Sequence, residues 1–308
     1  MGEEKKLNYK KIILVVAIII FTVACIYIGI ILPEITNKSE ENGENQEQEE
    51  QTSNREENVI QVVLDNKDKA ETPSREEKKP YPVINADGIE KIKNIYHSDY
   101  KRVFLTFDDG PSTTVTPEIL RILDEYNVKA TFFVLGSRVE LYPDLVKKEY
   151  EKGHYIANHG YSHKYSSIYA SVDNVLSEFR NTESIIRSVL GLSEYCSNVF
   201  RFPGGLPGGK SANLKKEAAT VLENNNIAHL DWNCLSKDAE GSFDKDTLVQ
   251  NVINTSQNKN SVVVLMHDAG NKKTTYEALP EVIEYFKNNG YAFESLYDVL
   301  DGQWYCKK

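Results

Sequence analysis

Apolar residues follow two different spacings in the C-terminal two thirds of the chain. After about residue 98, short apolar runs alternate with longer segments in which apolar residues recur every three or four positions. The short runs are typical of buried strands and the longer segments of amphipathic helices. Strands are predicted near residues 102–107, 130–135, 154–157, 198–202, 227–232, 261–265 and 291–295. Helices are predicted near residues 117–126, 143–152, 171–190, 212–225, 244–257 and 275–289.

The order of these elements predicts the fold class. Alternation of strand and helix implies a parallel α/β sheet with helical crossovers. Gly153, Gly191 and Gly290 follow helical stretches as stop signals, and Thr116-Pro117 is typical of a helix start. We expect a distorted, incompletely closed (β/α) barrel of about seven strands. A doubly wound open sheet is the alternative.

The N-terminal part of the chain has a long apolar run with charged residues on either side. Residues 12–32 form an apolar run that is long enough to cross a bilayer as a helix. Lysines precede it and an acidic segment follows, so residues 1–11 are predicted to be cytoplasmic and the remainder extracellular. A cleaved signal peptide would have a shorter apolar core, and the lipoprotein-like site ending at Cys25 is a poor match because apolar sequence continues beyond it. A retained single-pass transmembrane helix is therefore favoured.

Residues 33–97 are predicted to form an extracellular acidic linker. Up to about residue 80 they are mostly Glu, Asn, Gln, Ser and Lys, a composition that cannot bury enough surface to fold alone. The apolar run 59–64 would be either a short docking strand or an isolated apolar patch. Such a tether would let the domain at residues 98–308 search a volume next to the membrane.

The net charge and the cysteines exclude some classes of partner and of structural site. The 308-residue chain has a formal net charge of −10, which argues against nucleic acid as a partner. Its four cysteines form neither a disulfide framework nor the paired spacing of a zinc knuckle. Cys196 and Cys234 could pair if strands bring them together.

The candidate chemistry begins where the first predicted strand ends. Asp108 and Asp109 stand side by side there, followed by Gly110-Pro111. Two acids at the end of a buried strand are costly unless a cation neutralises them. One Asp would then be a metal ligand and the other would be free to take a proton. A surface turn is the alternative, since Asp, Gly and Pro are turn formers.

Other polar residues share this placement at predicted strand ends, which favours the metal interpretation because functional side chains of βα barrels lie there. His159 and His163, spaced i and i+4, can share one cation, and a carboxylate would complete a three-ligand set suited to zinc. Asp108 would be the base, and His267 the acid that hydrolysis also requires. Arg201 and Asp231 also lie at the ends of predicted strands. Arg201 could hold Asp108 ionised, and Asp231 could pair with His267 and keep it protonated. An ordinary ion pair between Arg201 and Asp231 at the barrel rim is the alternative.

These residues form five short motifs in order along the chain. They are Thr106-Phe107-Asp108-Asp109-Gly110, His159-x-x-x-His163, Arg201-x-Pro203-x-Gly205, Asp231-Trp232 and Leu265-x-His267. Together they resemble the motifs of the polysaccharide deacetylases of carbohydrate esterase family 4, the NodB-homology domain, over roughly residues 98 to 300.

The resemblance implies a distorted (β/α) barrel and metal-dependent removal of acetyl groups from N-acetylated sugars. Asp108 would be the general base and His267 the general acid, with Arg201 orienting Asp108 and Asp231 tuning His267. The implied metal ligands are Asp109, His159 and His163. The backbone N–H of Gly204 would be an oxyanion donor, and Trp232 and Leu265 would form the pocket for the acetyl methyl group; core packing is the alternative role for these two side chains.

Two positions depart from the family pattern. Gly160 stands where many members carry Ser or Thr, and Gly204 replaces a frequent Tyr, which would open that side of the groove. Neither change removes a catalytic atom, so activity is expected.

The expected function is metal-dependent deacetylation of N-acetylglucosamine in cell-wall peptidoglycan by a membrane-anchored, outward-facing enzyme. Zinc is the favoured metal, with Co²⁺, Ni²⁺ or Mn²⁺ as alternatives. N-acetylmuramic acid and extracellular poly-N-acetylglucosamine or chitooligosaccharide are alternative substrates. A catalytically silent glycan-binding module is the alternative from another class.

Overall fold

The computed structural model describes residues 84, 86–241 and 243–300. The predicted cytoplasmic segment, transmembrane helix and docking strand, and the linker up to residue 83, lie outside the described residues. Within the described ranges, no helix combines the length and the apolar character that a membrane span requires.

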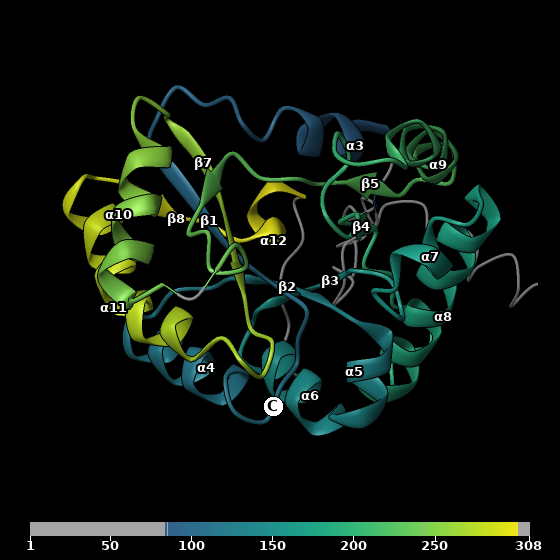
Figure 1. Ribbon diagram of the computed structural model, residues 1–308, viewed down its shortest axis with the longest axis horizontal. Coiled ribbons are helices and arrows are strands. Elements are labelled where there is room, and N and C mark those ends of the chain that lie inside the picture. Colours follow the sequence, from purple (N-terminus) through teal and green to yellow (C-terminus); the bar gives the residue numbers. More distant parts are fainter. Residues whose placement is uncertain (1–83, 85, 242, 301–308) are drawn as a thin grey trace, which may run out of the picture. The chain divides into compact units, whose positions relative to one another are not determined.

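The described residues form one parallel sheet (Figure 1). Its strands are β1 (Arg102–Asp108), β2 (Thr131–Val134), β3 (Tyr155–Asn158), β4 (Val199–Phe200), β5 (Ala228–His229), β6 (Cys234–Leu235), β7 (Ser261–His267) and β8 (Ala292–Phe293). The order across the sheet is β5-β4-β3-β2-β1-β7-β6, and β8 pairs with the start of β1. Because β5 and β6 are the two ends of this order and do not pair, the sheet is a curled half-barrel. The predicted incompletely closed barrel is confirmed, and the short strand β6 is an addition.

The six predicted helices are present with small shifts at their ends. They are α4 (Thr116–Glu125), α6 (Pro143–Glu151), α8 (Val172–Leu190), α9 (Ala212–Asn224), α10 (Lys245–Ser256) and α11 (Lys273–Asn288). Gly191 ends α8 with a left-handed φ of 66°, as its stop signal predicted. Four short helices were not predicted: α3 (Ala86–Lys93), α5 (Gly136–Leu141), α7 (Tyr165–Ile168) and α12 (Leu296–Val299).

The strands bury apolar side chains on both faces of the sheet. On β1, Val103, Leu105 and Phe107 belong to the core beneath the outer helices, and Phe104 belongs to a second core inside the curve. Figure 1 shows α12 inside the curve and the long helices around the outside. Since successive strand residues alternate between faces, Asp108 lies on the same inner face as Phe104.

Helix α3 corrects the predicted end of the linker. Ile89 and Ile92 on this helix and Ile95 just after it are buried in the inner core. Residue 84 and residues 86–97 therefore contribute to the folded domain, whose boundary lies further toward the N-terminus than residue 98. The three isoleucines recur every three residues, a helical spacing that the polar composition of the preceding segment obscured.

Cys196 and Cys234 do not form the disulfide that the sequence left open, since both are free. The Cys234 thiol instead lies against Thr255 of α10, 3.3 Å from its hydroxyl oxygen.

Candidate active site

Strands β1 and β7 bring the proposed base and acid together. The two strands run in parallel with Asp108 directly opposite His267. Asp108 is buried, whereas Asp109 turns away from the strand with a left-handed φ of 74° and is partly exposed. Both carboxylates still approach Nε2 of His159, Asp108 with Oδ2 at 3.7 Å and Asp109 with Oδ1 at 3.5 Å, but they differ in burial and so can have different roles.

The predicted metal ligands Asp109, His159 and His163 converge. One ligand atom from each lies within 4.8 Å of the others. The Oδ1 atom of Asp109 lies 3.5 Å from Nε2 of His159 and 3.3 Å from Nε2 of His163. Two imidazoles and one carboxylate are a donor set typical of zinc and similar divalent ions.

The chemical state of these groups fits a cation. Oδ1 of Asp109 is buried and has no hydrogen-bond partner among the described residues, although a buried carboxylate oxygen normally has one. Nδ1 of His159 lies 2.8 Å from the Arg201 carbonyl oxygen, an acceptor that fixes the proton on Nδ1 and leaves the Nε2 lone pair facing Asp109. Burial lowers the pKa of His159 to about 3, so its ring is neutral at physiological pH. Asp109, His159 and His163 therefore form a possible metal site.

Glu178 of α8 holds the loop between the two histidines, and sequence reasoning missed it. Its Oε2 accepts hydrogen bonds from the backbone N–H groups of Tyr161 and Ser162, each at 2.7 Å. Its Oε1 accepts one from the Ser162 hydroxyl at 2.6 Å. The backbone of this loop, in which Gly160 has φ 82° and His163 has φ 55°, is thus fixed without a Ser or Thr side chain at position 160.

Arg201 is fully buried and contacts the proposed base, as predicted. One guanidinium nitrogen donates to Oδ1 of Asp108 at 2.8 Å and to the Thr106 hydroxyl at 2.7 Å, and the group stacks 3.9 Å from the centre of the Phe133 ring. Burial raises the pKa of Asp108, and the charge of Arg201 partly opposes this. The second carboxylate oxygen, Oδ2, is 3.7 Å from Nε2 of His159 and therefore faces this candidate ligand.

The predicted pairing of Asp231 with His267 is wrong. Nδ1 of His267 lies 2.8 Å from Oδ1 of Asp238, whose other oxygen accepts from the His267 backbone N–H and from the Thr275 hydroxyl. Asp238 follows the unpredicted strand β6, which pairs with β7 and so carries the following loop to the end of that strand. Burial acts to lower the pKa of His267, but the hydrogen bond and charge of Asp238 raise it to about 9.

Asp231 instead helps to hold the loop that carries Gly204. Its carboxylate accepts from the backbone N–H of Leu206, at 3.1 Å for the nearer oxygen. The buried Lys215 ammonium donates to the Gly205 carbonyl at 2.6 Å, and the Tyr169 hydroxyl donates to the Pro203 carbonyl at 2.7 Å. Gly204 has a left-handed φ of 74°, and its N–H has no acceptor within the described part of the chain, as a candidate oxyanion donor requires.

A second loop contact fixes the turn after β1. The Thr116 hydroxyl, expected to cap α4, instead donates to the Asp268 carboxylate at 2.6 Å, while Val115 occupies the capping position. The Asp268 N–H donates to the Asp108 carbonyl at 3.0 Å. A side chain at Gly110 would overlap the Asp268 carboxylate, which explains the glycine beside Asp108 and Asp109.

The predicted apolar residues occupy different positions around this site. Leu265 is buried on the inner face of β7, two residues before His267 and opposite Thr106. The half-buried Trp232 lies beside Gly205, where a Cβ atom would approach its ring to 3.0 Å. Their role in binding an acetyl methyl group remains a prediction.

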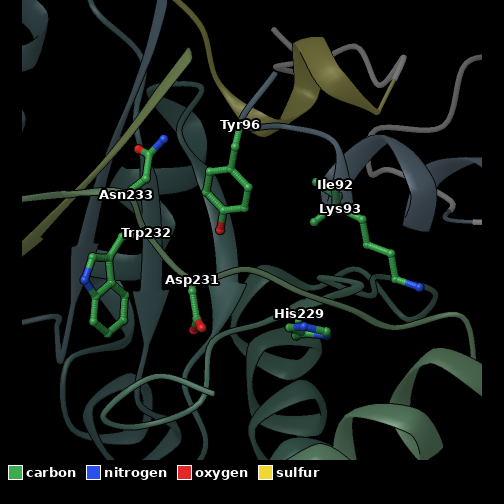
Figure 2. A pocket seen from close by; sticks show the side chains of 7 residues that line it. All are labelled: Ile92, Lys93, Tyr96, His229, Asp231, Trp232 and Asn233. Carbon is green, nitrogen blue, oxygen red and sulfur yellow. The ribbon is translucent and has the colours of Figure 1, made fainter. Parts of the chain in front are cut away.

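A pocket of about 410 Å³ lies beside this site rather than at it. Figure 2 shows the Tyr96 hydroxyl and the Asp231 carboxylate on its walls. None of the three candidate metal ligands lines it. Its lining residues are Ile92, Lys93, Tyr96, His229, Asp231, Trp232 and Asn233.

A curled parallel sheet with aspartates and histidines gathered at the carboxyl ends of its strands is the arrangement of an α/β enzyme. Residues 96–221 match the polysaccharide deacetylase family. The chain is 31% identical over 249 residues to a peptidoglycan-N-acetylglucosamine deacetylase of Bacillus cereus, covering 79% of this chain and 81% of that protein. The chain belongs to the polysaccharide deacetylase family, carbohydrate esterase family 4, and the predicted membership is confirmed.

Two further relatives bear on substrate and fold. The catalytic domain of peptidoglycan N-acetylglucosamine deacetylase from Eubacterium rectale superposes with a TM-score of 0.59 and 34% identity, covering 65% of this chain and 90% of that chain. The peptidoglycan-N-acetylmuramic acid deacetylase PdaC of Bacillus subtilis is 30% identical over 234 residues, covering 76% of this chain and 45% of that protein.

Proposed function

We propose that the protein removes the acetyl group from N-acetylglucosamine residues of peptidoglycan, with a divalent metal held by Asp109, His159 and His163. The observation that carries this proposal is the convergence of three ligand atoms within 4.8 Å, beside a buried base and a paired histidine. Zinc is the favoured ion because the donor set is two imidazoles and one carboxylate.

The proposed division of labour follows from the contacts of each side chain. A bound divalent ion would polarise the attacking water and the amide carbonyl. Asp108 would take the proton from that water on Oδ2, because its Oδ1 is occupied by Arg201. Burial favours this transfer, since it raises the pKa of the Asp108 carboxyl and makes it a better base.

His267 would give a proton to the leaving amine nitrogen. Asp238 holds its Nδ1 and raises the pKa of the ring to about 9, so His267 is protonated at neutral pH and Nε2 is free to donate. The Gly204 N–H would stabilise the negative charge that develops on the carbonyl oxygen. Trp232 and Leu265 would enclose the acetyl methyl group.

The location and substrate are also proposals. The apolar run at residues 12–32 and the acidic segment that follows support a single-pass membrane anchor with the catalytic domain outside the cell. Such an anchor would hold the domain within reach of a cell wall. The name of the Bacillus cereus relative supports N-acetylglucosamine as the sugar.

Acetate release tests this function. The full chain would be incubated with purified peptidoglycan and with chitotetraose, with added Zn²⁺ and with a chelator, and the sugar that acquires a free amine would be identified by mass spectrometry of the digested muropeptides. We expect metal-dependent acetate release and free glucosamine. Free muramic acid would instead indicate the specificity that the name of the Bacillus subtilis relative describes, and no acetate with any metal would favour a silent glycan-binding module.

A further inference from the structure

Tyr165 occupies the space above Gly204. A Cβ atom at position 204 would overlap the Tyr165 hydroxyl and lie 3.2 Å from the ring carbon that carries it. Gly204 therefore leaves room for a phenol that comes from a different loop. Tyr165 is the first residue of α7, two positions after the candidate ligand His163.

The Tyr165 ring connects the two catalytic loops. Its centre is 5.6 Å from the centre of the His163 ring and 5.6 Å from that of Tyr169, whose hydroxyl holds the Pro203 carbonyl. Tyr165 thus packs against a candidate metal ligand on one side and reaches the proposed oxyanion loop with its hydroxyl.

The hydroxyl of this side chain is available to a ligand. Tyr165 is 52% exposed, and its hydroxyl has no hydrogen-bond partner within the described ranges. A tyrosine hydroxyl can donate a hydrogen bond as well as accept one. An exposed aromatic ring with a free donor beside a hydrolytic centre has the chemistry to contact a sugar, whose hydroxyl and ring oxygens accept hydrogen bonds.

We propose that Tyr165 is a substrate-binding residue whose hydroxyl donates a hydrogen bond to the sugar that carries the reacting acetamide. This inference rests on the proposed function, since it assumes that an acetylated sugar lies at the Asp109, His159 and His163 cluster. It assigns to α7 one wall of the sugar site.

The test compares Tyr165→Phe with Tyr100→Phe. Tyr100 is 54% exposed and lies just before β1, at the opposite end of that strand from Asp108, and its hydroxyl donates to Glu294 at 2.6 Å. kcat/KM would be measured for chitotetraose and for 4-nitrophenyl acetate, which has no sugar. We expect Tyr165→Phe to lower kcat/KM for chitotetraose roughly five- to tenfold, the loss of one hydrogen bond, mainly through a higher KM. The ratio of chitotetraose to aryl acetate turnover should fall as well, and Tyr100→Phe should match the wild type in both.

Calorimetry with chitotetraose on the metal-free proteins supplies a readout that does not depend on turnover. We expect Tyr165→Phe to bind several times more weakly than the wild type and Tyr100→Phe to bind equally well. Equal affinity and an unchanged substrate ratio in Tyr165→Phe would overturn the inference. If the wild type releases no acetate, the proposed function fails, and the affinities alone decide whether Tyr165 contacts the sugar.

Discussion

Replacing Asp238 by Asn should move the alkaline limit of the reaction. Asp238 and His267 form a closely spaced pair, with the Asp238 side chain 1% and the His267 side chain 12% exposed. Asn keeps the shape and a carbonyl that can accept from Nδ1 of His267, but it removes the negative charge. It also places an amide NH2 where Oδ2 accepted from the His267 N–H and the Thr275 hydroxyl, so the substitution removes the charge together with these two hydrogen bonds.

The expected shift follows from the pKa of His267. Burial acts to lower this pKa from 6.5, yet the hydrogen bond and charge of Asp238, aided by Asp108 and Asp109, raise it to about 9. Without the Asp238 charge, burial should bring it to 6.5 or below, a change worth about 3 kcal/mol. At pH 8 the protonated fraction would fall from about 0.9 to about 0.03, so kcat/KM should drop about 30-fold.

Stability should change with pH in a linked way. A histidine whose pKa is raised in the folded state stabilises the fold fully below its unfolded value of 6.5, and the contribution is lost as the pH rises through about 9. The difference in thermal midpoint between the wild type and Asp238→Asn should therefore be largest near pH 6 and narrow toward pH 10.

The assay is the pH profile of kcat/KM for chitotetraose in the wild type, Asp238→Asn and Asp231→Asn. In Asp231→Asn the loop at Leu206 loses its acceptor charge, so turnover should fall while the alkaline limb stays at the wild-type pH. The assignment of Asp238 as the partner of His267 would be refuted if the alkaline limb of the kcat/KM profile stayed at the wild-type pH in Asp238→Asn. It would also be refuted if that limb moved to lower pH in Asp231→Asn.

Two further comparisons test the proposed metal site. Asp109→Ala should lose bound metal during gel filtration, because it removes the carboxylate shared by both histidines, whereas Asp108→Asn should retain metal and lose turnover by 10²-fold or more; equal metal loss in the two variants would contradict the separate roles. Glu178→Ala should weaken Zn²⁺ binding about 10- to 100-fold in a chelator competition, because the Tyr161 and Ser162 N–H groups lose their acceptor. Glu178→Gln should bind Zn²⁺ with nearly the wild-type affinity, because its side-chain carbonyl can still accept from both N–H groups. If Glu178→Gln loses as much Zn²⁺ affinity as Glu178→Ala, the charge of Glu178 is required rather than its hydrogen bonds.

The long strands and the proposed base and acid at their ends could be predicted because both depend on local sequence. Strands β1 and β7 are mostly apolar and seven residues long each, and Asp108 and His267 stand at their last positions. Strand β6 has only two residues, Cys234 and Leu235, which is too short for a period to appear. Because β6 was not predicted, the loop that follows it could not be placed beside β7. Asp238 could therefore not be recognised as the neighbour of His267.

The buried glutamates of α8 show what a sequence pattern does and does not specify about side chains that hold the site loops. Val175, Phe179 and Ile186 form its buried apolar stripe, and Glu178 and Glu183 lie within it. A buried carboxylate is costly unless several donors surround it, so acids inside an apolar stripe predict polar loops against that face of the helix. Glu178 finds its donors between the two histidines, and Glu183 finds them in the Asn158 side chain at 2.9 Å and in the N–H of residue 197 at 3.0 Å. Both glutamates are buried and both find donors in neighbouring loops, so the sequence pattern predicts that α8 holds loops in place. Which of the two acids binds the loop between the histidine ligands depends on how α8 packs against the end of β3, which the pattern does not specify.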